Sequence, residues 1–76
     1  MSYEELAKEW REQQSEAHRK NSGVVLVWED SVYGWKNELR DANHERPGAI
    51  AVNLDGNIFR AEAGDDFNGA LGWVAL

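Results

Sequence analysis

The run VVLVW, residues 24–28, is the feature that most restricts what this chain can fold into. It is a continuous β-branched and aromatic stretch, bounded by Gly23 before it and by Glu29, Asp30 and Ser31 after it. Uninterrupted apolar runs of this kind are typical of strands that are buried on both faces of a sheet. We therefore expect a central strand here, and both of its faces need a cover of apolar side chains.

The first twenty residues can supply one of these covers. Ser2 followed by Glu5 forms a capping box, the pattern that satisfies free amide groups at a helix start. Stop signals at residues 21–23 then predict a helix over about residues 2–20. Its apolar residues recur at helical spacing and give one stripe, formed by Tyr3, Leu6, Ala7, Trp10 and Ala17. One helix covers one face of a sheet, so the other face must be covered by loops or by another chain.

The rest of the chain reads as further strands and turns. Residues 31–36 predict a strand joined to the first by a tight turn, with Gly34 marking a bulge or a close approach, and residues 37–48 predict a surface loop with room for one helical turn. Asp55 and Gly56 between two apolar runs signal a hairpin, and a second turn at 64–69 precedes a short last strand. The predicted fold is α+β, with one N-terminal helix packed on an antiparallel sheet of three to five strands. We expect a single domain over 1–76, with the helix at about 2–20 and the β-rich part at about 24–76.

The composition restricts the partners. Fourteen acidic residues against eight basic ones give a net charge of -6, which opposes direct binding to nucleic acid and favours a basic partner. The longest apolar run has five residues, far below the roughly 20 that span a bilayer, so we expect no membrane contact. The chain has no cysteine, which fits a reducing compartment, so we expect a cytoplasmic protein.

Four glutamates form the most regular charge pattern in the chain. Their spacing returns each one to nearly the same side of the predicted helix, and we call this set, Glu5, Glu9, Glu12 and Glu16, the glutamate ladder. Like charges one turn apart cost a helix a few tenths of a kcal/mol, which hints at a use. The ladder is either a solvated helix face or an acidic surface presented to a cationic groove. Aromatic residues are enriched at binding hot spots, and we expect Tyr33 and Trp35 to act as anchors.

Metal and catalytic sites find little support in the sequence. An EF-hand register centred on Gly56 places Ala51 where the first carboxylate should stand, so a hairpin turn explains that segment better. His18 and His44 lack the spacing of a zinc site, and no glycine-rich phosphate loop occurs. About 76 residues rarely enclose a catalytic pocket alone. We expect no enzyme activity, no cofactor and no metal.

In length, acid excess, absence of cysteine, glutamate ladder and the tryptophan-rich segment VVLVWEDSVYGW, residues 24–35, the chain resembles the small acidic counter-defence proteins of bacteriophages and mobile elements. Anti-CRISPR and antirestriction proteins are among them. The resemblance implies a non-catalytic inhibitor that occludes or mimics nucleic acid on a basic protein or nucleoprotein complex of a bacterial host, in the host cytoplasm.

Two other classes stay open at this point. One is an immunity protein or antitoxin that neutralises a basic toxin, and the other is an oligomerising structural module. The doubly apolar run at 24–28 also favours a homodimer over a monomer whose loops fold over the second face.

Overall fold

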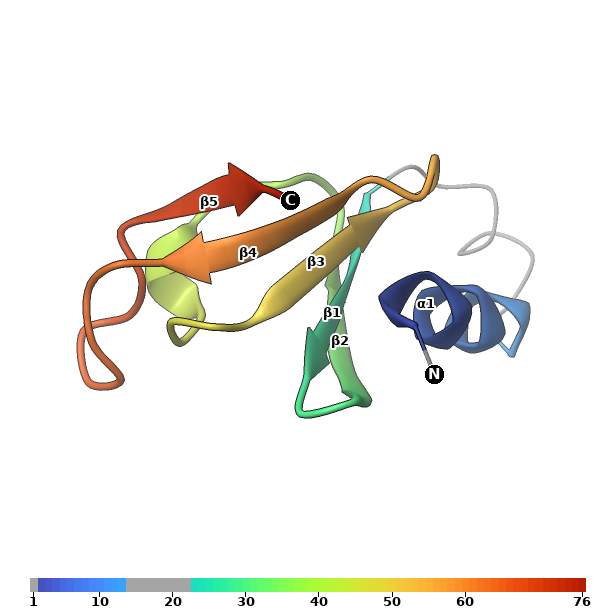
Figure 1. The fold of residues 1–76 in the computed structure, drawn as a ribbon, viewed down its shortest axis with the longest axis horizontal. Coiled ribbons are helices and arrows are strands. Elements are labelled where there is room, and N and C mark those ends of the chain that lie inside the picture. Colours follow the sequence, from blue (N-terminus) through green and yellow to red (C-terminus); the bar gives the residue numbers. More distant parts are fainter. Residues whose placement is uncertain (1, 14–22) are drawn as a thin grey trace.

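The computed structural model describes residues 2–13 and 23–76, and within them one N-terminal helix packs on a five-stranded antiparallel sheet (Figure 1). The predicted α+β fold is thus confirmed. The sheet order is β2-β1-β3-β4-β5, so β2 and β5 are the edge strands. The elements are α1 (Tyr3–Glu12), β1 (Val24–Trp28), β2 (Ser31–Lys36), the short 3-10 helix η1 (Ala42–His44), β3 (Ile50–Asn53), β4 (Ile58–Glu62) and β5 (Gly72–Ala75).

Helix α1 begins where the capping signal places it. The Ser2 Oγ accepts a hydrogen bond from the Glu5 backbone amide at 3.1 Å, which satisfies one of the free donors of the first turn. The described part of the helix ends at Glu12. The predicted extension to Lys20 lies outside the described residues.

Strand β1 is an interior strand and is covered on both faces. Its first four residues are buried, and β2 and β3 pair with it on either side. Val25 and Val27 face α1, where they form a cluster with Ala7 and with residues of β3. Val25 and Val27 are completely buried, and each contributes roughly 1.5 to 3 kcal/mol to folding.

The opposite face of β1 is covered by the chain itself. Val24 and Leu26 pack there with Ala51, and Leu39, Phe59 and Trp73 close over them. Leu39 belongs to the loop between β2 and β3, residues 37–49, which carries η1 as its one short helical turn. The loop is tied to the end of the sheet, because the Ala70 amide donates to the Glu45 carbonyl at 2.9 Å. The second cover that β1 requires is therefore this loop.

Strand β2 contains a bulge next to Gly34. Leu26 pairs with Gly34 and Val27 pairs with Val32, so Tyr33 is an extra residue with no partner across the ladder. Before it, Glu29 and Asp30 form the tight turn, and both have positive φ. The bulge changes which side chains of β2 share a face.

The N-cap offers a test of how α1 is held. Ser2→Ala should lower the free energy of unfolding by about 1 kcal/mol, because an amide of the first turn loses its acceptor. Ser2→Asp keeps an acceptor and should stay near the wild-type value. Urea unfolding followed by tryptophan fluorescence measures both. Equal stability of Ser2→Ala and wild type would show that the cap does not support the docked helix.

Candidate functional site

The described part of the glutamate ladder is exposed along α1. Glu5, Glu9 and Glu12 all face solvent, and Glu16 lies outside the described residues. Among the described residues, none of these three glutamates forms an ion pair. The ladder therefore presents bare carboxylates over about two turns of helix.

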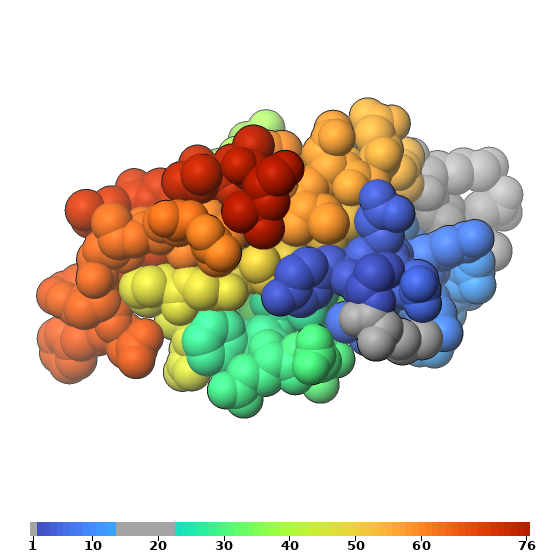
Figure 2. Space-filling view, viewed as in Figure 1, coloured from blue at the N-terminus to red at the C-terminus, as the bar shows by residue number. Residues whose placement is uncertain are grey.

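A groove of about 630 Å³ runs between α1 and the turn that joins β3 to β4. We call it the acidic groove. Carboxylates stand on both of its walls, since Glu4, Glu5 and Glu12 come from the helix and Asp55 comes from the turn. Lys8 and Arg11 of the helix also line it, so carboxylates outnumber basic side chains four to two. Leu54, half exposed, adds an apolar surface on the turn side. Figure 2 shows the helix in blue beside the turn in light orange.

Basic side chains in the described part of the chain are largely occupied by contacts within the protein. Arg11 lines the acidic groove but is buried, and it donates to the Gly23 carbonyl at 3.0 Å. Burial lowers the pKa of Arg11. Arg60 pairs with Glu62 at 2.7 Å, and Arg40 lies near Glu38 and Asp41. Helix α1 itself carries four glutamates against Lys8 and Arg11, so negative charge is in excess on α1 and on the exposed turns.

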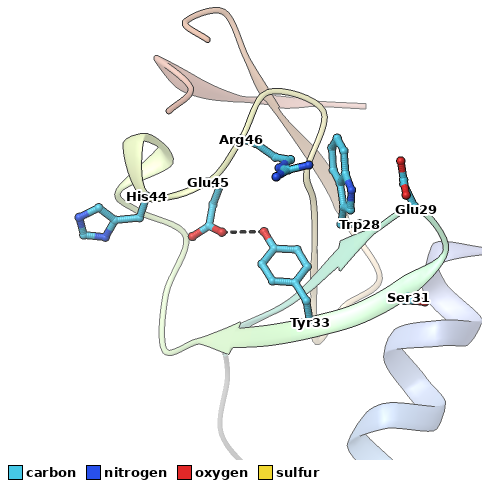
Figure 3. A pocket seen from close by; sticks show the side chains of 7 residues that line it. All are labelled: Trp28, Glu29, Ser31, Tyr33, His44, Glu45 and Arg46. Atoms are coloured by element: carbon cyan, nitrogen blue, oxygen red, sulfur yellow. Dashed lines mark hydrogen bonds between the residues drawn. The ribbon is translucent and has the colours of Figure 1, made fainter. Parts of the chain in front are cut away.

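A second pocket of about 540 Å³ lies on the side of β2 that faces away from α1 (Figure 3). At its centre is the buried carboxylate of Glu45. The Tyr33 hydroxyl donates to Glu45 Oε1 at 2.6 Å, and Lys36 Nζ lies 2.9 Å from Glu45 Oε2. Burial, the hydrogen bond and the negative charge of Glu45 raise the pKa of the Tyr33 phenol. Lys36 therefore compensates the charge of this carboxylate, and Tyr33 and Lys36 together hold it in place, as expected of a structural group.

The outer wall of this pocket is a stacked pair. The guanidinium of Arg46 lies 4.7 Å from the centroid of the Trp28 ring, within cation–π range (Figure 3). Arg46 is exposed, and Glu29, Ser31 and His44 complete the pocket. One face of the Trp28 indole is therefore occupied by Arg46 of the same chain.

The sequence-predicted site residues do not lie together. Glu5, Glu9 and Glu12 share α1, whereas Tyr33 points into the pocket on the other side of β2. Trp35 packs partly buried against the cluster beneath α1. Glu4, Leu54 and Asp55 were not singled out as binding residues from the sequence, because the groove they line joins segments about 50 residues apart. Glu45 was also missed, since a glutamate in a polar loop reads as a surface residue.

Searches for other kinds of site in the described residues give two findings. No group of three or more acidic or histidine side chains there is arranged to hold a metal ion. No helix among them is long and apolar enough to cross a membrane.

The comparisons with protein-family models, curated proteins and solved structures find no match for this chain. The geometry and charge of the surface are therefore what indicates a function.

The buried ion pair of Glu45 and Lys36 predicts a large loss of stability when the lysine is replaced. Lys36→Met should lower the free energy of unfolding by about 3 kcal/mol, because it leaves a buried carboxylate without a compensating charge. Arg60→Met breaks an exposed pair of similar length and should cost less than about 1 kcal/mol. Adding Glu45→Gln to Lys36→Met should recover part of the loss. Similar losses for Lys36→Met and Arg60→Met in urea unfolding would contradict this assignment.

Tyr33 predicts a loss of stability at alkaline pH. Its raised pKa means that the folded protein keeps the phenol proton above about pH 10, where the unfolded chain releases it. Stability from this group is therefore complete below about pH 10 and falls as the pH rises further. Between about pH 9 and pH 11, the urea midpoint of Tyr33→Phe should fall less than that of wild type. Tyr3→Phe removes the other tyrosine hydroxyl and is the control; equal slopes for all three proteins would contradict the prediction.

Proposed function

We propose that this protein is a non-catalytic inhibitor of nucleic-acid-processing machinery, of the anti-CRISPR or antirestriction type. It binds a basic surface of a bacterial host complex through α1 and the acidic groove. The observation that carries the proposal is the charge arrangement: carboxylates stand on both walls of the groove and outnumber its basic side chains, and Glu9 adds a further exposed carboxylate on α1.

Charge and apolar contact have different roles in this proposal. Attraction between a chain of net charge -6 and a cationic surface speeds association, but physiological salt screens it beyond about 8 Å. A contact that persists needs a desolvated apolar group. Leu54 is half exposed on the wall of the groove, beside Asp55. An arginine or lysine of the partner that enters the groove meets carboxylates on two sides and packs its aliphatic stem on Leu54.

The geometry of the ladder supports mimicry of a nucleic-acid backbone as well as simple occlusion of the partner's cationic surface. Successive glutamates one helical turn apart are spaced by roughly 6 Å, which is similar to the spacing of phosphates along a nucleic-acid strand. A cationic channel that accepts a nucleic-acid backbone can accept this row. The partner is a basic protein or nucleoprotein complex, and contact takes place in the cytoplasm of the host.

Tyr33 and Trp35 remain candidate anchors. The Tyr33 side chain points to the side of β2 that faces away from α1. A flat partner surface therefore cannot contact both the ladder and Tyr33. Among the described residues that line the acidic groove with Glu5 and Glu12, Leu54 is the exposed large apolar side chain. We therefore assign the anchoring role in this contact to Leu54.

The first experiment identifies the partner. The tagged protein is used to recover binding proteins from a bacterial host lysate at low and high salt, followed by mass spectrometry. Recovery of a basic nuclease or a surveillance complex, with release by salt, is the expected result. A single small basic toxin would favour the antitoxin alternative. Recovery of no basic protein would overturn the proposal.

Charge reversal then tests the surface itself. Glu9→Lys with Glu12→Lys should slow association with the recovered partner about tenfold at low salt and flatten its salt dependence. Glu29→Lys with Asp66→Lys makes the same change in net charge at exposed sites that do not line the acidic groove, and should retain most of the rate. Leu54→Ala should mainly speed dissociation. Surface plasmon resonance over a salt series measures these rates, and equal effects of the two double variants would leave the ladder as a solvated helix face.

A further inference from the structure

Exposed apolar side chains gather in the last ten residues of the chain. Residues 67–76, which we call the C-terminal strip, contain no charged residue and form the longest such stretch in the sequence. Most large hydrophobic side chains that the described part of the protein leaves exposed belong to it. Phe67 is 95% exposed, Leu71 79%, Leu76 62% and Val74 45%. In a chain with a net charge of -6, this is an unusual surface.

The strip includes an edge strand that is open to pairing. Strand β5 is the last in the sheet order, and the Leu76 amide donates to the Ile58 carbonyl at 2.9 Å. In the antiparallel register of β4 and β5, this bond places the backbone groups of Val74 toward β4. The amides and carbonyls of Trp73 and Ala75 therefore point to the open edge.

The two edges of the sheet are protected differently. Strand β2 carries the bulge at Tyr33 and the basic Lys36, two features that hinder edge pairing. Strand β5 has no charge, no proline and no shift in its register with β4. Its open edge lies at the top of Figure 1, and α1 lies at the lower right. The edge that lacks protection is therefore remote from the acidic groove.

We propose that β5 pairs with β5 of a second copy of this chain, in an antiparallel arrangement that joins two sheets into one. Charge argues for this occupant. Two copies of net charge -6 repel each other across most surfaces, whereas no residue of the C-terminal strip brings a charged side chain to the contact. The nearest charged side chains on β4, Arg60 and Glu62, neutralise each other at 2.7 Å. A basic partner would gain no electrostatic attraction from this strip.

The pairing is also self-complementary. An antiparallel strand pair related by a two-fold axis satisfies the same outward amides and carbonyls in both copies. Val74 lies opposite Arg60 on β4, and in a β5 pair centred on Val74 its side chain would meet its equivalent across the junction, with Trp73 of each copy opposite Ala75 of the other. The contact leaves α1 exposed in both copies. This inference does not depend on the proposed function, and it places the dimer at β5 rather than on a face of β1.

Sedimentation velocity tests the proposal over about 1 to 100 μM protein. We expect wild type to shift from 8.6 kDa toward twice that mass as concentration rises. Ala75→Pro removes an outward amide without a change in charge, and Val74→Lys places a charge at the junction. Each should weaken dimerisation at least about tenfold. Leu54→Lys makes the same charge change at another half-exposed site and should leave the dimer intact.

Amide hydrogen exchange of the wild-type chain gives a readout that no folding defect can mimic. Protection of the Trp73 and Ala75 amides should rise with protein concentration, while protection across β1 should not change. A wild-type monomer at 100 μM would overturn the proposal. So would a dimer that persists in both β5 variants, with their fold verified by circular dichroism. If wild type is monomeric and the β5 variants lose a lysate protein that wild type recovers, the edge accepts a foreign strand and the second copy is excluded.

Discussion

Coverage of β1 on both faces is the constraint on which the rest of the structure depends. One cover is α1, whose first turn is closed by its N-cap, and the other is the loop of residues 37–49. A polar loop does not stay on an apolar face without an attachment. One attachment is the carboxylate of Glu45, which joins the loop to β2 through Tyr33 and Lys36. This buried charge adds to the packing of Leu39 on the face of β1 and to the backbone bond between Ala70 and Glu45.

Local signals in the sequence were sufficient for most of the fold. The capping serine, the uninterrupted run at 24–28 and the pair Asp55 and Gly56 each act within a few residues, so their structures could be predicted from their neighbours. The burial of Glu45 could not, because it depends on residues of β2 and on the carbonyl contact with Ala70. Long-range contacts decide which members of a polar segment leave the surface.

The candidate site likewise combines features that local sequence patterns predict with features that depend on long-range contacts. Helical periodicity correctly placed Glu5, Glu9 and Glu12 on one exposed face. Simple alternation along β2 would put Tyr33 and Trp35 on a common face, but the extra residue in the bulge separates them, so that Trp35 packs under α1 while Tyr33 faces away from it. The far wall of the acidic groove comes from the β3–β4 turn, and no local pattern connects that turn to the helix.

The sheet order has a consequence for how the chain folds. The pairs β1–β2, β3–β4 and β4–β5 join strands that are neighbours in sequence, whereas β1–β3 spans the whole loop of residues 37–49. The chain therefore consists of two locally closed units, a hairpin and a three-stranded meander, and a single strand junction unites them. Entropy lost in closing that loop falls on this one step. We therefore expect the folding barrier at this junction, where Val25 pairs with Val52, and β5 to add to the sheet after it.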